Sequence, residues 1–282
     1  MKKYNLAKII LAILLGACSL AAQAQWAVSV TTGSADYELS AIEGTFVDSI
    51  DDRFFYRDLS LDYSWDNHQV AVKIGGLAKS NGAIDIKSST ELGATIQTGD
   101  AERDEWSMYY TYRTEVGVAL TAGYYSSEAD TVRSFTANFT QGSLNGTFIQ
   151  SADKVVENDG FFLGAAYGMA LSERTGVFAR LGYQWSDVEE QIDATQNFTI
   201  PVQAGNTNVV TSQQTFTRSL DLSGNAIVYG VGGYWAVTDN ISLNLFYEVK
   251  DFDYSEDAYN DGGSVQLEEE QDMLGLTLRY SL

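Results

Sequence analysis

The sequence predicts an all-β protein: a closed, antiparallel, up-and-down transmembrane β-barrel, with ten strands as the preferred count. Three observations predict it. Apolar and polar residues alternate in ten separate segments, which is the period of a β-strand. Long and short connections alternate strictly between those segments. Aromatic residues gather near the ends of the apolar stripes, where a membrane strand meets water.

The amino terminus precedes the barrel and reads as an export signal. Residues 1–24 combine three early lysines, the apolar stretch 9–15 and the small-residue site Ala22-Gln23-Ala24. The barrel domain is therefore expected to span residues 25–282. The run Leu15-Gly16-Ala17-Cys18 also resembles a lipoprotein processing site, so lipidation at Cys18 stays open. Cys18 is the only cysteine, and a chain cleaved after residue 24 has no disulfide or thiolate chemistry.

The ten expected strands follow in chain order, each about as long as a tilted strand needs to cross the hydrocarbon layer. Their apolar stripes begin at Trp26, Leu59, Val70, Trp106, Val116, Phe161, Val177, Ile227, Ile241 and Leu274. The last stripe runs to the final residue, Leu282, and should pair with the first to close the ring. Short turns are expected at 66–68, 114–115, 172–175 and 238–240, and long loops at 37–55, 80–104, 127–160, 188–224 and 254–270.

The strand count has two weaker alternatives. Residues 131–152 and 196–220 carry interrupted apolar stripes, and Pro201 argues against a central strand in the second. Both are interpreted as hairpins standing above the membrane. Twelve strands would result if they crossed it, and eight is less favoured still.

Aromatic residues at the stripe ends predict two girdles at the water interfaces. They are Trp26, Trp65, Trp235 and Tyr280 at the short-turn end, and Trp106, Tyr124 and Trp185 at the other. The opposite strand face is rich in glycine and carries charges in mid-strand, as a narrow, crowded lumen requires.

Nine charged residues are assigned to the lumen by strand parity. They are Asp58, Asp62, Lys73, Glu105, Arg113, Arg180, Glu248, Lys250 and Arg279. The favoured interpretation is a lumen plugged by compensating ion pairs, because buried charges need partners. The alternative is a charged constriction that selects ions or small solutes. Asp62 and Lys73, on adjacent strands, are expected to pair diagonally.

No catalytic residue is predicted. His68 is the only histidine, and it lies in a short turn at the end opposite the long loops. Serine–histidine or aspartate–histidine chemistry at the outer end would therefore lack its base. No cofactor is expected. A weak calcium candidate exists in the last long loop, where Asp257, Asp261 and Glu268 match positions 1, 5 and 12 of a calcium loop, although Tyr259 breaks position 3.

Charge excludes one class of partner. The 17 basic residues include three lysines of the leader, so 14 basic residues stand against 38 acidic ones in the mature chain, a net charge of −24. Such a chain is not expected to bind nucleic acid. The long loops hold most of this charge, and a solvated acidic surface is preferred over diffuse binding of divalent cations that bridge to lipopolysaccharide phosphates.

The pattern resembles the small outer-membrane β-barrel proteins of the opacity and porin-like type. The resemblance rests on the leader, on Trp26 opening the first strand, on Gly232-Gly233-Tyr234-Trp235, and on the ending Leu276-Thr277-Leu278-Arg279-Tyr280. It implies a monomer in the bacterial outer membrane, in contact with lipid and lipopolysaccharide, whose last strand is recognised by the barrel assembly machinery. Such proteins usually end on Phe, and this chain departs from them by ending on Leu282. The function expected is non-enzymatic, structural or in surface interaction, with a narrow porin-like channel as the alternative.

Overall fold

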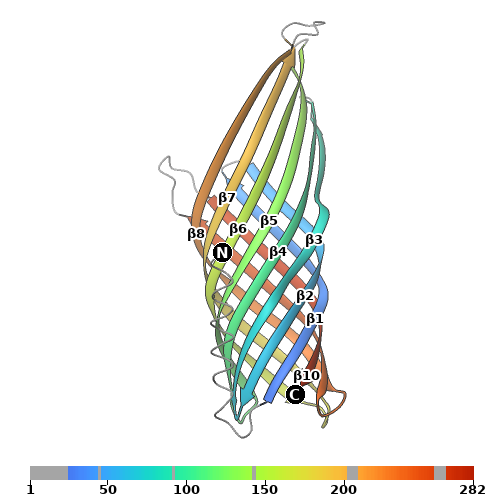
Figure 1. Cartoon of the computed structure of the whole chain (residues 1–282), viewed down its shortest axis with the longest axis vertical. Coiled ribbons are helices and arrows are strands. Elements are labelled where there is room, and N and C mark those ends of the chain that lie inside the picture. Colours follow the sequence, from blue (N-terminus) through green and yellow to red (C-terminus); the bar gives the residue numbers. More distant parts are fainter. Residues whose placement is uncertain (1–24, 44–45, 91–92, 142–143, 202–208, 257–264) are drawn as a thin grey trace.

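The computed structural model describes residues 25–43, 46–90, 93–141, 144–201, 209–256 and 265–282, and these form one closed antiparallel barrel of ten strands. The strands are β1 (Gln25–Glu43), β2 (Phe46–Trp65), β3 (His68–Thr90), β4 (Gly93–Arg113), β5 (Val118–Gln141), β6 (Leu144–Ala170), β7 (Thr175–Pro201), β8 (Val209–Ala236), β9 (Ile241–Glu256) and β10 (Val265–Ser281). Neighbours in sequence are neighbours in the barrel, and β1 pairs with β10 (Figure 1). The fold class, the count of ten and the closing pair are as the sequence predicts.

The turns at the end of the barrel where β10 ends, called here the lower end, are short, also as predicted. Asp66 takes a positive φ of 48° in the first of them. The second turn is longer than expected, and β5 begins at Val118 instead of Val116. Gly117 has a φ of 84° there, and the hydroxyl of Thr114 accepts from the backbone N–H of Val118 at 3.1 Å. The side chain of Thr114 thus closes the turn before the strand starts.

The strands are much longer than nine to eleven residues, so the five predicted long loops are wrong. β9, the shortest strand, has 16 residues and β8, the longest, has 28. The segments predicted as loops are mostly paired strand. The hairpin reading of residues 131–152 and 196–220 is confirmed, because β5 pairs with β6 as far as Gln141 and Leu144, and β7 with β8 as far as Pro201 and Val209.

The outward-facing side chains differ in polarity between the lower and the upper end of the strands. On β10 the leucines at 274, 276 and 278 point outward and are exposed, whereas Leu267 and Met273 point inward and are buried. The outward positions farther up β10 are acidic instead, namely Glu268 and Glu270. Apolar residues therefore cover the outside of the lower barrel and fill the inside of the upper barrel. This is the arrangement of a barrel that stands in hydrocarbon at one end and in water at the other.

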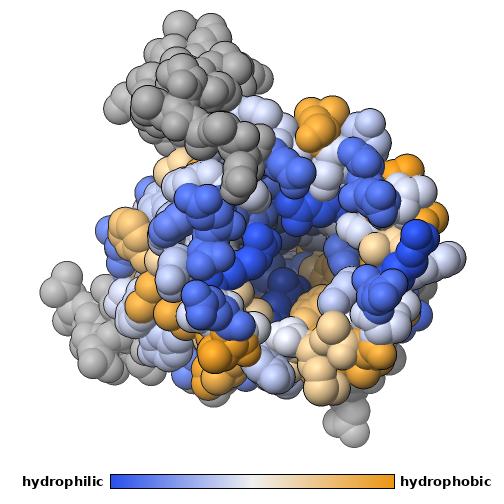
Figure 2. Space-filling model, turned by 90° about the horizontal axis from the view of Figure 1, so that it is seen from below, coloured by the Kyte–Doolittle hydropathy of each residue, from blue (hydrophilic) through white to orange (hydrophobic). Residues whose placement is uncertain are grey.

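An apolar band surrounds the lower barrel. Its members alternate with inward residues on every strand and include side chains that are at least half exposed: Val30, Leu59, Ile74, Leu120, Leu163, Leu181, Val231, Leu245, Leu274 and Leu278. Seen from the short-turn end, the molecule is hollowed at its centre and hydrophilic residues line the hollow (Figure 2). No helix in the described part of the chain is long and apolar enough to cross a membrane.

The ring of pairing is incomplete at the upper end. β2 and β3 pair only from Tyr56 and Leu77 down to the turn, and β8 and β9 only from Ser223 and Ser255 down. Above these points the strands continue as two separate sheets. Strands β3 to β8 form one, called here the tall sheet, and β2–β1–β10–β9 form the other, called the short sheet. β7 and β8 rise high above the ring, with β8 at the edge of its sheet (Figure 1).

Candidate functional site

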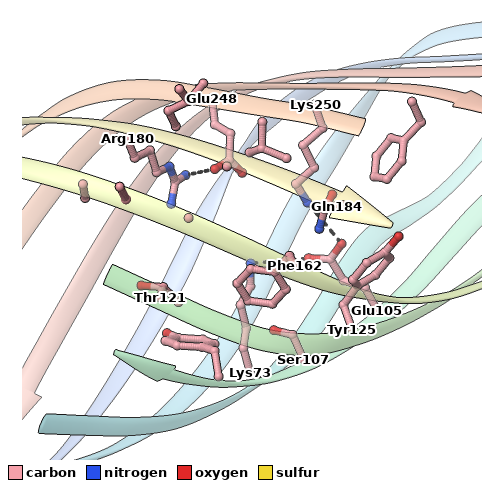
Figure 3. Close-up of a pocket in the computed structure, with 18 of the residues that line it drawn as sticks. Lys73, Glu105, Ser107, Thr121, Tyr125, Phe162, Arg180, Gln184, Glu248 and Lys250 are labelled. Atoms are coloured by element: carbon pink, nitrogen blue, oxygen red, sulfur yellow. Dashed lines mark ion pairs between the residues drawn. The ribbon is translucent and has the colours of Figure 1, made fainter. Parts of the chain in front are cut away.

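The lower lumen holds charged residues that pair with one another across strands. The Nζ atom of Lys73 lies 3.3 Å from Asp58 Oδ2 and 3.4 Å from Glu105 Oε1. Lys250 reaches the other oxygen of Glu105 at 3.6 Å. The hydroxyl of Tyr56 lies 2.7 Å from Asp58 and 3.0 Å from Glu105 and donates to these carboxylates. Two lysines and two carboxylates from four strands therefore neutralise each other, partly in view in Figure 3.

Two smaller groups complete the lower lumen. The first is the ion pair between Arg180 and Glu248, in which the guanidinium also lies 5.3 Å from the ring centroid of Phe246 (Figure 3). Arg180 comes from β7 and Glu248 from β9, with Gly230 of β8 between them in register. The glycine leaves the space through which the two long side chains meet.

The second group lies around Asp62, close to the short turns. Gln69 donates to Asp62 Oδ1 at 2.9 Å, and Arg279 Nη2 lies 3.9 Å from Asp62 Oδ2. Arg113 donates to Gln69 Oε1 at 2.5 Å. This group links β2, β3, β4 and β10, so it crosses the barrel closure between β1 and β10.

All nine residues assigned to the lumen by parity thus belong to these three groups. One predicted pair is wrong, because Lys73 and Asp62 each bind another partner. The register places Lys73 opposite Ser60, so that Asp58 and Asp62 are both its diagonal neighbours. Lys73 forms ion pairs with Asp58 and Glu105, and Asp62 forms one with Arg279. Parity fixes the face of a residue, but it does not choose between two diagonals.

The upper lumen is filled by a cluster of buried apolar residues, called here the plug. It comprises Ala35, Tyr37, Leu39, Phe54, Tyr56, Leu77, Ala101, Tyr125, Ala129, Val156, Val188, Leu222, Ala226, Phe252, Tyr254, Leu267 and Met273. Every strand of the barrel contributes at least one of these side chains. These buried side chains pack against one another inside the upper barrel.

Two ion pairs are buried in the plug, and the sequence analysis missed both. Arg103 pairs with Glu269, and their side chains are only 3% and 4% exposed. Arg103 also donates to Ser127 at 3.1 Å. Lys154 Nζ lies 2.6 Å from Glu190 Oε2, with both side chains 3% exposed. Each charge has an opposite charge at contact, as burial requires.

A chain of hydrogen bonds crosses the plug from β5 to β10. The hydroxyl of Tyr125 donates to Asn158 Oδ1 at 3.1 Å, and the amide of Asn158 donates to the hydroxyl of Tyr254. Tyr254 in turn donates to Glu269 at 3.4 Å. Asn158, Tyr254 and Glu269 lie in segments that the sequence analysis assigned to loops. The signal that could have found them is the continued period of two with its phase reversed, such as Glu268 outward and Leu267 inward.

A cavity of about 380 Å³ lies beneath the plug. Tyr125 and Phe252 belong both to its wall and to the plug, and Arg103 lines it as well. Arg180 and Glu248 line another part of the wall (Figure 3). The cavity and the hollow seen from the short-turn end show that the lower lumen has free space (Figure 2). The lumen is therefore filled above and roomy below.

The predicted aromatic girdles form two groups on the outer surface. At the upper edge of the band, ring centroids are 5.5 Å apart for Trp106 and Tyr124 and 5.2 Å for Tyr124 and Phe161, and Phe161 lies opposite Trp185 in register. At the lower edge, Trp26 contacts Tyr63 at 4.8 Å and Tyr63 contacts Trp65 at 5.6 Å. Trp235 and Tyr280 also lie in strand ends next to short turns.

Rows of carboxylates lie on the outer surface just above the upper aromatic residues, and are called here the acidic belt. On the tall sheet, directly opposed residues run across five strands: Asp104, Glu128, Glu157, Glu189 and Asp221. On the short sheet, Glu38 opposes Glu270, and Glu270 opposes Asp251. Like charges at directly opposed positions destabilise a sheet, so the belt is costly for the fold.

The pKa values in the belt reflect this crowding. Burial, followed by the neighbouring carboxylates of Asp272 and Asp251, raises the pKa of Glu270 above its ordinary value. Asp36 behaves in the opposite way, because Arg53 donates to it at 2.6 Å and lowers the pKa of Asp36. The belt thus contains a carboxylate that holds its proton more tightly than usual.

His68 lies at the lower edge of the band, as predicted. Its ring stacks on Trp65 at 5.3 Å between centroids, and its Nδ1 lies 2.6 Å from the hydroxyl of Tyr110. Both contacts belong to the lower aromatic group. The only histidine of the chain is therefore built into the outer surface of the barrel, on the side away from the acidic belt.

Most of the weak calcium candidate lies outside the described residues. Asp257 and Asp261 lie outside the described residues, as does Cys18 with the whole segment 1–24. Glu268 is described and lies exposed on the outer face of β10. Among the described residues, no group of three or more His, Cys, Asp or Glu side chains has the arrangement of a metal site.

Comparison with known proteins shows the fold of the chain. No family model and no curated protein sequence matches the chain. Among solved structures, the outer membrane protease OmpT from Escherichia coli matches with a TM-score of 0.53 and 11% identity, over 92% of this chain and 97% of that chain. The fold is that of an outer-membrane β-barrel. The identity is too low to carry the activity of OmpT over to this chain.

Two further similarities are weaker. The toluene transporter TodX of Pseudomonas putida matches with a TM-score of 0.38 and 9% identity, over 92% of this chain and 90% of that chain. The attachment invasion locus protein Ail of Yersinia pestis matches with a TM-score of 0.25 and 14% identity, over 90% of this chain and 98% of that chain.

Proposed function

We propose that this chain is a non-enzymatic outer-membrane barrel with a plugged lumen, and that its role is structural or in surface interaction. The observation that carries the proposal is the plug, in which seventeen apolar side chains and the buried pair Arg103–Glu269 fill the upper lumen. Ions would have to pass a close-packed core, and a pore needs continuous water or polar sites along its length. What the barrel offers to other molecules is then its outer surface.

The proposal includes the location and the immediate neighbours of the barrel. We place the apolar band in the outer membrane with the short turns in the periplasm and the tall strands outside. The acidic belt then lies at the level of the lipopolysaccharide headgroups, and β10 is the strand that the assembly machinery would recognise. The belt is proposed to be solvated. Calorimetry with calcium would contradict this if it showed more heat than a magnesium control at the same ionic strength.

The absence of enzymatic activity is supported by the position of His68, which is far from the exposed upper barrel and packed against Trp65. A histidine-dependent hydrolase would need its base near the outer loops. A screen with peptide and lipid substrates tests this point. Turnover that disappears when belt carboxylates such as Glu157 and Glu189 are replaced by glutamine would overturn it.

A planar-bilayer recording tests the plugged lumen. The wild-type protein is expected to insert without a stable unit conductance. A variant with Phe252 and Tyr254 both replaced by alanine is the matched control, because it removes the two largest side chains that β9 places in the plug. This variant should conduct. A stable, repeatable unit conductance of the wild type would overturn the proposal.

A narrow channel is the second candidate, and the free space in the lower lumen is the observation that favours it. Such a channel would require the plug to open. The charged residues of the lower lumen, among them Lys73 and Glu248, would then form a charged constriction that selects ions or small solutes. Cation preference in the recording, lost on exchange of Glu105 for glutamine, would support this second candidate.

A further inference from the structure

Among the described strands, only β7 pairs with the upper half of β8, so the other side of this strand is an open sheet edge. Residues 209–222 pair with β7 along their whole length, from Pro201–Val209 to Val188–Leu222. Pairing with β9 begins only at Ser223, and no other described strand lies against this edge. About half of the backbone N–H and C=O groups of such an edge point away from the sheet. Fourteen residues at ~3.4 Å each give an edge of about 45 Å.

The upper part of β3 forms the other edge of this sheet, and it is less suited to pairing with a further strand. The upper part of β3 also lacks an outer partner among the described strands, but its pairing with β4 shifts register twice, between Leu77 and Ser80 and between Asn81 and Ile84. It also carries Lys79 and Lys87. Bulges and lysines are devices by which sheet edges avoid further pairing.

β8 lacks both devices. Its pairing with β7 shows no register shift between Val209 and Leu222, and the segment contains neither lysine nor proline. Its charged residues are Arg218 and Asp221, and three of its fourteen residues are threonine, which favours strand structure. The edge is long, regular and ready to take another strand.

The two faces of β8 define what that strand must look like. On the inner face Leu220 and Leu222 are buried and Phe216 is 41% exposed. An added strand would therefore place apolar side chains on this face, where Phe216 has room to gain contacts. Side chains alternate between faces, so its other residues would point to the outer face.

The outer face next to the edge is acidic. Asp221 lies directly opposite Glu189, and Glu189 opposite Glu157, so the row of the belt ends at the open edge. A surface cavity of about 510 Å³ beside it is lined by Glu157, Asp159, Asp187, Glu189, Asp221 and Ser223, together with parts of Val188 and Leu222. Long basic side chains on an added strand would reach into this cavity and relieve the repulsion between opposed carboxylates.

We propose that the upper edge of β8 binds an extended polypeptide segment of a partner protein, with basic and apolar residues in alternation, by adding it to the sheet as a further strand. The backbone of the edge supplies the hydrogen bonds, and the two faces of β8 supply the choice of side chains. The inference rests on the proposed surface-interaction role and names the partner for it.

The test uses the full-length protein in detergent micelles and a twelve-residue probe of alternating lysine and valine. Two probes serve as controls: one with glutamate in place of lysine, and one with alternate backbone amides N-methylated. The lysine probe is expected to bind and to slow hydrogen exchange of the amides in residues 209–222. Either control probe should bind at least about tenfold more weakly, about 1.4 kcal/mol.

A charge-reversal variant makes the test specific for the site. Asp221→Lys should weaken binding of the lysine probe by at least about tenfold, and Asp251→Lys, on the outer face of the short sheet, should leave it unchanged. Equal binding of the N-methylated probe would overturn the proposal. Slow exchange, in the free protein, of those amides of residues 209–222 that point away from β7 would also overturn it, because the edge would already be covered, either within the monomer or by a second copy in a dimer detected by sedimentation. None of these failures would produce a conductance, so the plugged lumen would stand.

Discussion

Replacing Arg103 by methionine tests how tightly the plug is packed. The substitution leaves Glu269 as a buried carboxylate, 4% exposed, without its counter-ion. It also removes the donor to Ser127 and the cation that lies 5.7 Å from the ring centroid of Tyr37. Removing one partner of a buried ion pair costs about 3–5 kcal/mol of folding free energy. That loss is large beside the few tenths of a kcal/mol typical of a surface substitution, ~0.5 kcal/mol at most.

The double variant Arg103→Met with Glu269→Leu separates charge from packing. It removes both charges and keeps the volume, so its free energy of unfolding should lie within about 1 kcal/mol of the wild type or above it. Arg53→Met is the matched control, because Arg53 and Asp36 form a pair on the exposed outer surface and its loss should not be measurable.

Urea unfolding in lipid vesicles, followed by fluorescence of the five tryptophans, measures these differences. The dependence of the free energy on urea concentration should be the same for all variants, since they expose the same surface. A single variant Arg103→Met that unfolds at the wild-type urea concentration would refute the reasoning. Glu269 would then have water around it, and the upper lumen would not be closed.

Three further outcomes are expected. Gly123→Ala should prevent or strongly destabilise folding, because its Cβ would lie 2.7 Å from the ring of Phe162, while Gly168→Ala, whose nearest contact is 3.9 Å away, should fold normally in a heat-modifiability gel assay. Tyr56→Phe should lower the free energy of unfolding by about 1–3 kcal/mol in the urea assay, since two carboxylates lose a donor. The raised pKa of Glu270 means that the folded state binds this proton more tightly than the unfolded state, so this residue's contribution to stability falls as pH rises from its ordinary value of 4.5 through the raised value. Glu270→Gln should flatten that pH dependence, and an unchanged slope between pH 4 and 8, a range of about four units, would contradict the assignment.

Much of the lower barrel can be predicted from the sequence, because lipid enforces a simple rule there. Every second residue from Leu274 to Leu282 is apolar, and no loop can replace a strand in hydrocarbon. The same rule gives the inward face, and with it the lumen charges such as Arg279. What parity leaves open is the partner of each charge, as Lys73 shows by pairing with Asp58 and Glu105.

The same rule explains why the strands of the upper barrel were predicted to be loops. Above the lipid the outside is water, so apolar residues move to the inner face and acids to the outer face. A search for outward apolar stripes therefore ends near Trp106 and Trp185 and reads the rest of each strand as loop. The alternation itself continues, as Val188 and Leu222 inward with Glu189 and Asp221 outward show. The split into two sheets depends on register between strands, which no single strand encodes.

Thiol labelling tests the central claim, a lumen open from the short turns and closed by the plug, most directly. The expected mature chain has no cysteine, so Ala166→Cys, in the wall of the cavity, introduces a single thiol. In vesicles with uniformly inserted protein, a membrane-impermeant maleimide should label this thiol when added on the short-turn side and leave it unlabelled when added on the side of the tall strands. Equal labelling from both sides would contradict the account.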